Sequence, residues 1–362
     1  MPPGVAVRGG RRRRRAGRNE RRGGPSARYV GSFGRELEAR PARTRRVACP
    51  AVPGEFEIRE VGPEDMGAWV AVYNRAAPCR PVTAEGVAHH RSMEPELLAL
   101  LALRDGEPVG IAQVWPERHW QPASTKAEFQ VMVDRPHRRG GVGTVLAGEV
   151  SRWAAGHGCD GLDVHVYEND PDGLRHWLAR GFREVSRERH ARIELREVAI
   201  PPPGPPDGVL LATLAERMDL LESVYGVALE ALPDMPAPEP VVPPSFEEWR
   251  HAEIGFQELM PEASVLAVAG DEVVGYALLR RFAARPDVGH NMITGVRRSW
   301  RGRGVAGAMK RLQAALALRG GLAAIETEND DENAPMRAIN LRLGYRPIPD
   351  SLWLRGPLQP PP

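Results

Sequence analysis

The chain has 362 residues, 42% of them hydrophobic, which is too long for one ordinary domain and enough for two domains of about 150 residues. No run of about 18 apolar residues occurs, which argues against a membrane-spanning helix. The three scattered cysteines form no CxxC pair, which excludes a disulfide framework or a zinc site and favours a reducing, cytoplasmic compartment.

The net charge of +2 conceals an asymmetry, because 15 Arg against 3 Glu give residues 1–50 a charge of +12 and leave −10 for the rest. Residues 1–54 have few large apolar residues and show neither the helical nor the strand period. They cannot bury enough surface to offset chain entropy, so we expect disorder. An arm that binds nucleic acid through phosphate contacts is one interpretation of the run Arg11 to Arg15. A tail without such a role is the interpretation we favour, so nucleic acid is not an expected partner.

Residues 55–197 follow as a first domain. Alternation in 56–60 predicts a strand, and Asp65 then begins a helix whose apolar residues share one face. The apolar runs 97–103 and 108–114 are joined by the turn residues Asp105-Gly106, which predicts a hairpin. Further elements are expected at 129–133 (strand), 142–155 (helix), 162–167 (strand) and 174–178 (short helix).

Residues 198–362 repeat this order after a proline-rich break at 201–206. We expect a helix over 214–231 and, after a second proline-rich loop, a helix that Ser245 caps, with Glu248 at capping-box spacing. Further elements are expected at 264–269 and 273–279 (hairpin strands), 292–296 (strand), 305–318 (helix), 323–328 (strand) and 334–343 (helix). The repeat indicates an internal duplication of an α/β unit with a mixed sheet.

Each copy places a loop rich in glycine and arginine between a strand and a helix, at 133–144 and at 296–306. Glycines let backbone N–H groups approach an anion closely, and the following helix adds unpaired N–H groups and the positive end of its dipole. Each copy is therefore predicted to bind phosphate through a strand–loop–helix unit. Neither loop has the Gly-Lys-Ser/Thr of a Walker A motif or the spacing GxGxxG.

Both loops resemble the motif Arg/Gln-x-x-Gly-x-Gly/Ala of the GNAT superfamily of N-acetyltransferases. The matching residues are Arg138, Gly141 and Gly143 in the first copy and Arg301, Gly304 and Ala306 in the second. The resemblance covers roughly residues 55–195 and 207–355. It implies two tandem domains, each a mostly antiparallel, twisted sheet flanked by helices, in which the fourth and fifth strands splay apart.

The resemblance also implies acetyl-CoA as the cosubstrate. In that family the loop amides bind the CoA pyrophosphate, and the strand before the loop faces pantetheine. Carried over, the cofactor-binding residues of the first copy are Val131, Met132, Val133, Arg138, Arg139, Gly140, Gly141, Val142, Gly143 and Thr144. Those of the second copy are Thr294, Gly295, Val296, Arg301, Gly302, Arg303, Gly304, Val305 and Ala306. A family asparagine that reaches the cofactor matches Asn333 and, more loosely, Asn169.

Many family members carry a tyrosine four residues before a conserved glycine, as the acid that protonates the departing CoA thiolate. The matching residues here are Trp177, which cannot serve as that acid, and Asn340, which can only donate a hydrogen bond. The acid is therefore left open, to come from elsewhere in the chain or from solvent.

The base that takes a proton from the acceptor amine is also open. The candidates in the second copy are His290, Glu326 and Glu328, and His165 and Glu168 hold similar places in the first. Each has a plain structural alternative, since strand-end carboxylates are usually solvated and a lone histidine is more often an ordinary core or surface residue.

The second copy has the cleaner loop and the better asparagine segment, so we expect it to be the catalytic one. The first copy is then degenerate and either binds acyl-CoA without turnover or serves as a pseudo-symmetric wall of the substrate cleft. The expected function is transfer of an acetyl group from acetyl-CoA to an amine of a small molecule, by direct attack in a ternary complex, since no cysteine lies on a motif. One alternative is a non-catalytic acyl-CoA-binding protein with two degenerate domains. Another is an enzyme like the tandem mycothiol synthases, whose C-terminal half is similar although the tyrosine is Asn340 here. We expect no metal and no membrane partner.

Overall fold

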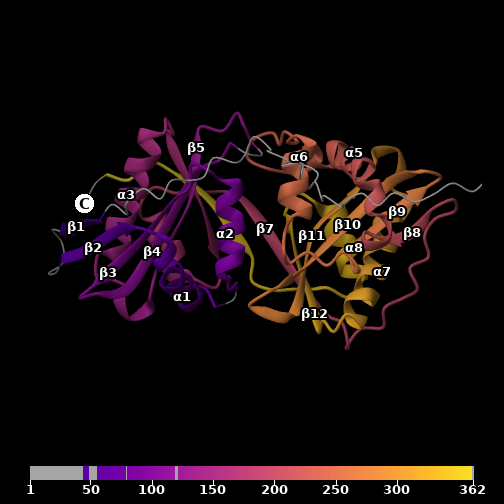
Figure 1. The fold of residues 1–362 in the computed structure, drawn as a ribbon, viewed down its shortest axis with the longest axis horizontal. Helices are drawn as coiled ribbons and strands as arrows, with labels where there is room; N and C mark the ends of the chain where they lie inside the picture. Colours follow the sequence, from indigo (N-terminus) through magenta and orange to yellow (C-terminus); the bar gives the residue numbers. More distant parts are fainter. Residues whose placement is uncertain (1–43, 49–54, 79, 119–120, 361–362) are drawn as a thin grey trace, which may run out of the picture. The chain divides into compact units, whose positions relative to one another are not determined.

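The structure is a computed structural model that describes residues 44–48, 55–78, 80–118 and 121–360 (Figure 1). We call β1 to β7 the N-terminal half and β8 to β14 the C-terminal half. The N-terminal half contains β1 (Thr44–Ala48), β2 (Glu55–Glu60), α1 (Met66–Ala76), α2 (Ala84–Met93), β3 (Leu98–Arg104), β4 (Glu107–Pro116), β5 (Lys126–Val133), α3 (Val142–Gly156), β6 (Gly161–Tyr167), α4 (Pro171–Leu178) and β7 (Arg183–Glu194). The C-terminal half contains β8 (Leu210–Thr213), α5 (Leu221–Ala231), α6 (Phe246–Trp249), β9 (Val265–Ala269), β10 (Glu272–Phe282), β11 (Arg285–Val296), α7 (Val305–Arg319), β12 (Ala324–Asp330), α8 (Ala334–Arg342), β13 (Arg346–Pro347) and β14 (Ser351–Gly356).

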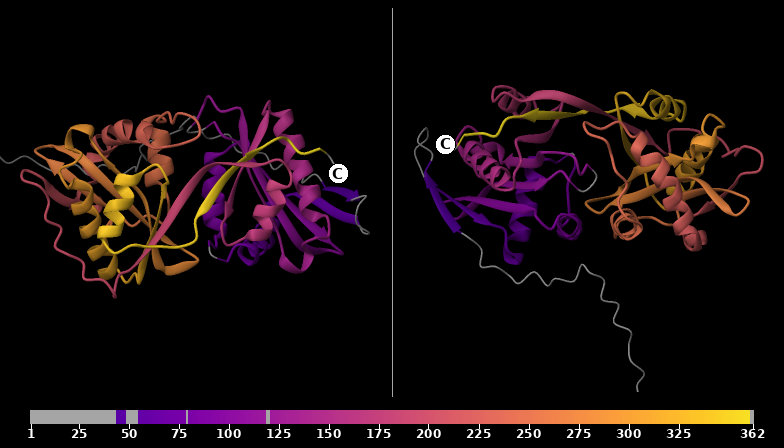
Figure 2. Two further views of the ribbon diagram at one scale, coloured as in Figure 1. Left: turned by 180° about the vertical axis from the view of Figure 1, so that it is seen from behind. Right: turned by 90° about the horizontal axis from the view of Figure 1, so that it is seen from above.

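The described strands form a single mixed sheet in which the two halves exchange strands. Its order is β1-β2-β3-β4-β5-β6-β14-β7-β12-β11-β10-β9-β8, with β13 paired to β7 off this path. Strand β14 of the C-terminal half lies between β6 and β7, and β7 of the N-terminal half pairs with β12. Figure 2 shows the yellow β14 lying beside the pink β7. Each half therefore has its sheet completed by a strand of the other.

Helices cover both faces of the sheet in the C-terminal half. Side chains alternate across a strand, so Tyr276 and Leu278 of β10 pack with α5 and α6, in a core that contains Val224 and Trp249. Their neighbour Ala277 packs with α7 instead. We call these two sides the α5 face and the α7 face.

Most of the locally encoded elements agree with the sequence predictions. Both hairpins are present, and the turn between β3 and β4 has the positive φ values of 53° at Asp105 and 83° at Gly106 that such a turn needs. Ser245 caps α6 in a complete capping box with Glu248. Residues 201–206 contain no helix or strand, as the prolines indicate.

Other elements correct the predictions. The single helix expected over 214–231 is interrupted, because Arg217 has non-helical angles inside a 3-10 turn (Ala215–Leu220) and α5 begins only at Leu221. The strands β7 and β14 and the helix α2 were not predicted. Strand β1 lies inside the segment 1–54 for which disorder was predicted; residues 1–43 and 49–54 of that segment lie outside the described residues.

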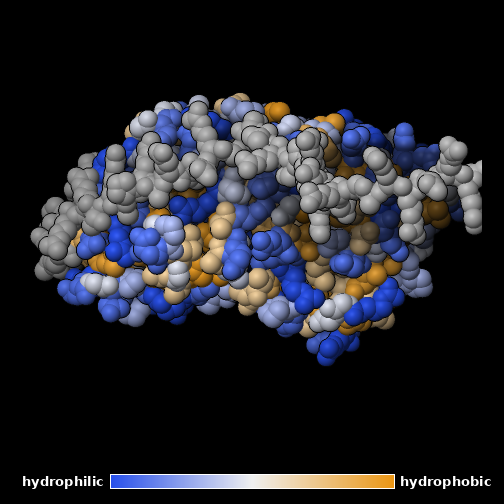
Figure 3. All heavy atoms as spheres, viewed as in Figure 1, coloured by the Kyte–Doolittle hydropathy of each residue, from blue (hydrophilic) through white to orange (hydrophobic). Residues whose placement is uncertain are grey.

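The surface drawn in Figure 3 has hydrophilic and hydrophobic residues interspersed. In the part of the chain that the structure describes, no helix is both long and apolar enough to cross a membrane.

Candidate functional site

The two predicted phosphate loops have the same backbone. In each, an arginine Nε donates a hydrogen bond to the carbonyl oxygen of the last residue of the preceding strand. The distances are 3.1 Å from Arg138 to Val133 and 2.9 Å from Arg301 to Val296. The following helix begins after a glycine with a left-handed φ, 82° at Gly141 and 87° at Gly304. The Arg138 and Arg301 side chains therefore use Nε to fix the loop.

The loop of the C-terminal half, residues 297–304, fits an anion. A Cβ added at Gly302 or at Gly304 would meet no atom within 4 Å, so the backbone lies open there. Gly304 has no side chain to cap α7, so the first amides of the helix and the positive end of its dipole remain available to a ligand. Arg298 and Arg301 are held by Asp234 at 2.7 and 2.6 Å. The loop can therefore accept a phosphate or pyrophosphate group.

The arginines of the N-terminal loop are also paired with carboxylates. Arg138 pairs with Asp170 at 3.2 Å, and Arg139 lies 3.5 Å from Asp172. These residues and Asn169 line an open cavity of about 490 Å³. Asp170 caps α4 as Asn333 caps α8, each accepting from a backbone amide three residues on. Asp170, and not Asn169, thus holds the place of Asn333.

The strand before each loop separates from its parallel neighbour. β5 and β6 pair only as far as Phe129 and Val164, and β11 and β12 only as far as His290 and Glu326. Beyond these pairs the strands diverge, as the resemblance implied. We call each opening a fork.

Of the two strands that precede the loops, only β11 has a β-bulge at its fork. β5 pairs with β4 in unbroken register, whereas β11 opposes Asn291 to Leu279 and Ile293 to Leu278, so Met292 has no partner on β10. A bulge leaves its extra residue outside the ladder. The Met292 backbone is therefore available to a ligand in the fork.

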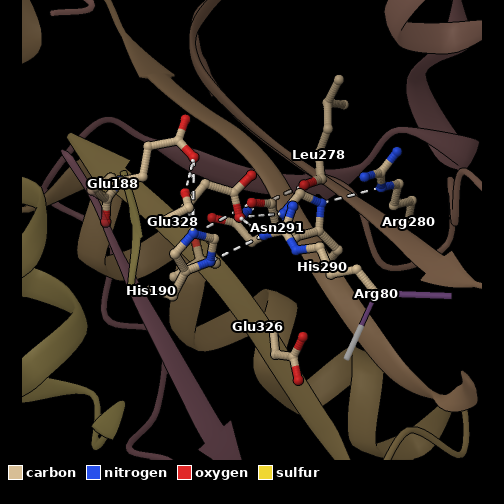
Figure 4. A network of polar contacts seen from close by, with 12 residues as sticks. Arg80, Glu188, His190, Leu278, Arg280, His290, Asn291, Glu326 and Glu328 are labelled. Carbon is tan, nitrogen blue, oxygen red and sulfur yellow. Dashed lines mark hydrogen bonds and ion pairs between the residues drawn. The ribbon is translucent and has the colours of Figure 1, made fainter. Parts of the chain in front are cut away.

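A polar network crosses from one half to the other at the C-terminal fork (Figure 4). His290 Nε2 lies 2.7 Å from Glu328 Oε2, and Arg280 Nε donates to His290 Nδ1 at 3.1 Å. Arg80 of the N-terminal half donates to the same Glu328 oxygen at 3.1 Å and lies 3.0 Å from His190 Nδ1. Since Arg280 can only donate, His290 carries its proton on Nε2.

The charges of this network follow from its burial. Burial lowers the pKa of His290, and Arg280 adds to this effect while Glu328 opposes it. Burial alone would raise the pKa of Glu328, but His290 and Arg80 outweigh it and hold that pKa well below its usual range. The site at neutral pH is a neutral imidazole beside a carboxylate.

The other predicted catalytic residues are placed differently. Burial raises the pKa of Glu326, but Arg285 and Arg192 outweigh it, and they contact both carboxylate oxygens at 2.7 to 2.9 Å. Figure 4 shows Glu326 apart from the His290 cluster. Asn340 is buried and donates to Asn329 Oδ1 at 2.7 Å.

The candidates of the N-terminal half lie at its fork. His165 lies 3.9 Å from Glu128, a residue that the sequence interpretation missed, and 3.7 Å from Glu188. Burial, followed by the carboxylates Glu117 and Asp163, raises the pKa of Glu128 well above its usual range. Glu168 is 3.7 Å from Arg187 and half exposed.

Aromatic rings fill the N-terminal fork on the side of the sheet that α3 covers. Trp177, which stands where the family has its tyrosine, is 4% exposed. Its ring packs edge-on against Phe129, with 4.9 Å between ring centroids, and its centroid lies 5.1 Å from that of Phe182. The sequence interpretation missed this packing and three residues at the C-terminal fork: Arg80, Arg280 and Lys310. Lys310 had one visible signal, since it is one of only two lysines in the chain and lies within the predicted helix.

Comparison with protein families finds one match. The profile of the acetyltransferase (GNAT) family matches two regions, residues 69–182 and 227–345, which contain the two loops and the two forks. No curated protein sequence matches the chain.

Solved structures share the fold over most of the chain. A GCN5-related N-acetyltransferase from Sphaerobacter thermophilus has a TM-score of 0.65 and 24% identity, over 84% of this chain and 96% of that one. A tandem GNAT protein from the clavulanic acid biosynthesis pathway has a TM-score of 0.67 and 18% identity, over 84% of this chain and 99% of that one.

Proposed function

This chain belongs to the acetyltransferase (GNAT) family, and on that premise we propose that its C-terminal half transfers the acetyl group of acetyl-CoA to an amine of a small molecule. The observation that carries the proposal is the combination of an open phosphate loop with a bulged strand at the same fork. Attack is direct, in a ternary complex, since the one cysteine in the described residues, Cys159, is a buried core residue of the N-terminal half.

The cosubstrate supplies an acyl thioester, and the chain binds and orients it. The amides from Gly302 to Ala306 hold the pyrophosphate, and the edge of β11 from Thr294 to Val296 guides the pantetheine arm toward the bulge. We assign the Met292 backbone, which is free of the β10 ladder, as the donor to the carbonyl oxygen of the thioester. Asn333 uses its side-chain oxygen to cap α8, so only its amide N–H groups can reach the cofactor.

The acceptor amine approaches from the α5 face, where His290 and Glu328 lie. Both ring nitrogens of His290 are engaged, by Arg280 and by Glu328. The recorded contacts of Glu328 all use Oε2, so Oε1 is the oxygen that can receive the amine. We assign Glu328 as the group that orients the amine and takes its proton, with His290 and Arg80 holding the carboxylate in place.

We propose one working site per chain. In the N-terminal fork, Trp177, Phe129 and Phe182 occupy the face on which the C-terminal fork has polar side chains. The N-terminal half then serves as a partner that supplies Arg80 and strand β7.

Calorimetric titration of the full chain with acetyl-CoA tests this proposal. We expect a stoichiometry near one, loss of binding in Gly304→Glu, and unchanged binding in Gly141→Glu. Both glycines have a left-handed φ, 82° and 87°, so the two variants carry similar backbone strain while placing the carboxylate in different loops.

Three outcomes contradict the proposal: binding lost only in Gly141→Glu, two equal sites, or no binding by a folded wild-type chain. Binding at the C-terminal loop without acetylation of any amine in a broad screen of small amines would support the non-catalytic alternative.

A further inference from the structure

Lys310 is a buried lysine on the α7 face of the C-terminal fork. It is 2% exposed, and its Nζ donates to Asn291 Oδ1 at 2.7 Å. Its other near neighbour is the ring of Tyr345, whose centroid lies 5.4 Å from Nζ. An ammonium has three N–H donors, and Asn291 is the single hydrogen-bond partner recorded for Nζ among the described residues. The remaining donors can serve a ligand.

The position of Lys310 along the fork is fixed by Asn291. Asn291 directly follows His290, the last residue of β11 that pairs with β12, and directly precedes the bulge at Met292. Consecutive strand residues point to opposite faces. His290 and Glu328 therefore meet the acceptor from the α5 face, and Lys310 reaches the same point of the fork from the α7 face.

The N-terminal half has no such group at the matching positions. When the two loops are aligned and the bulge is allowed for, Lys310 matches Ala147, Asn291 matches Phe129 and Asn340 matches Trp177. All three N-terminal residues belong to one hydrophobic core. In the C-terminal half the matching residues are buried polar groups, with exposed fractions of 2% to 3%. All three are hydrogen-bonded, Lys310 to Asn291 and Asn340 to Asn329, as buried polar groups must be. The fork with the bulge therefore has a bonded polar cluster where the other fork has an apolar core.

We propose that Lys310 is the proton donor to the sulfur of the departing CoA in the C-terminal half. This inference rests on the acetyltransferase function proposed above. As the carbon–sulfur bond breaks, its electron pair passes to sulfur, and an Nζ proton of the Lys310 ammonium forms the thiol and leaves a neutral amine. The proton that the acceptor amine gives up on the α5 face returns to the lysine through solvent, so no co-reactant is needed.

The groups around Lys310 suit this role. Burial lowers the pKa of Lys310 to about 7, and Glu328 on β12 opposes this shift. An acid with a pKa near neutrality is half charged at pH 7, which lets it both give and regain a proton. The phenol of Tyr345 is a weaker acid than this ammonium, because burial raises its pKa further above a usual value that is already well above neutrality. Asn340 has no proton of the required acidity.

The thiol of bound CoA provides a readout that needs no acceptor amine. Wild-type protein is saturated with CoA, and the rate at which iodoacetamide alkylates the CoA sulfur is followed by mass spectrometry from about pH 6 to about pH 10. We expect the pKa of the bound thiol to be at least one unit lower in wild type than in Lys310→Met, which corresponds to about tenfold more thiolate at neutral pH. Lys126→Met is the matched control, because it removes the other lysine of the chain, which pairs with Asp160 in the N-terminal half.

Equal thiol titration in wild type and Lys310→Met would overturn the role of Lys310 while leaving the acetyltransferase proposal standing. Absence of CoA binding, or binding at the N-terminal loop, would instead refute the underlying function.

A measurement on the wild-type chain covers the case in which Lys310→Met does not fold. Protein labelled with ¹⁵N-lysine contains two Nζ groups, and Lys126→Met identifies the Lys310 signal. We expect CoA to raise the pKa of Lys310 relative to desulfo-CoA, which binds through the same pyrophosphate but has no sulfur to share the proton. Identical titration curves with the two ligands would overturn the proposal.

Discussion

Arg355 on β14 donates from Nε and Nη2 to the carboxylate of Asp163 on β6, at 2.8 and 2.7 Å, and Asp163 is fully buried. The pair joins the C-terminal half to the sheet of the N-terminal half. On the other exchanged strand, Arg192 contacts Glu326 at 2.9 Å. The two halves are therefore joined by ion pairs inside the sheet as well as by backbone hydrogen bonds, so we expect them to unfold together.

Replacing Arg355 tests this coupling. Arg355→Ala leaves the buried carboxylate of Asp163 without its partner, and we expect the free energy of unfolding to fall by about 3 kcal/mol. Urea unfolding is followed by tryptophan fluorescence and by circular dichroism, and the two curves should still coincide. Arg175→Ala, which removes an exposed pair with Asp172, is the control and should change stability by less than about 1 kcal/mol. Two separated transitions in the wild type would contradict the coupling.

Lys310 gives a pH-dependent prediction. Its folded pKa, about 7, lies below the unfolded value, so the unfolded chain binds one more proton between about pH 7 and pH 10. Wild-type stability therefore contains a contribution that rises with pH across this window. In Lys310→Met the contribution is absent, and Thr294 still donates to Asn291 Oδ1. We expect the variant to be more stable at pH 7, by on the order of 2–4 kcal/mol, with a gain that shrinks toward pH 10. A gain that does not depend on pH would be inconsistent with the buried ammonium.

Glu328 stabilises the folded state at neutral pH, whereas the buried Lys310 destabilises it. Its folded pKa is held well below the usual range, so its contribution to stability is present above about pH 4.3 and is lost as the pH falls through the folded value. Glu328→Gln should lose about 2 kcal/mol at pH 7, since Arg80 loses its counter-charge, and should match the wild type in strong acid.

The same variant separates binding from catalysis. We expect Glu328→Gln to abolish acetyl transfer while the Kd for acetyl-CoA, measured by calorimetry, changes by less than about threefold, a difference below about 1 kcal/mol. Full activity in this variant would remove Glu328 from the mechanism.

Trp177 provides a test of the filled N-terminal fork. Trp177→Ala removes a ring from an aromatic cluster, and we expect a loss of about 3–5 kcal/mol of stability. The stoichiometry of acetyl-CoA binding should stay near one if the C-terminal loop alone binds. Appearance of a second site in this variant would show that the ring alone closes the N-terminal fork.

The parts of the site that the sequence predicted are encoded locally. Each loop needs left-handed glycines directly before a helix, and both requirements can be seen within a few residues, as at Gly304 and Val305. The hairpin turn at Asp105-Gly106 and the capping box at Ser245 are local for the same reason.

The parts that were not predicted depend on distant contacts. Arg80 and Glu328 are separated by 248 positions in the sequence, and no local pattern predicts their pairing. Strand β7 is rich in charged residues because its side chains pair with β12 and β14, so it lacks the apolar alternation that identifies a half-buried strand. The bulge at Met292 is set by register with β10, which a single strand does not reveal.

The exchange of strands also sets an order on biosynthesis. During translation the nascent chain can form β2 to β6 early. Strand β6 then has β5 on one side, and it gains β14 on the other side only after Arg355, 192 positions beyond Asp163, has left the ribosome. Until then β6 presents an open edge, and open edges recruit other chains. Pairings of such high contact order also form slowly. The yield of soluble protein is therefore expected to depend on chaperones that shield this edge while the ribosome completes the chain.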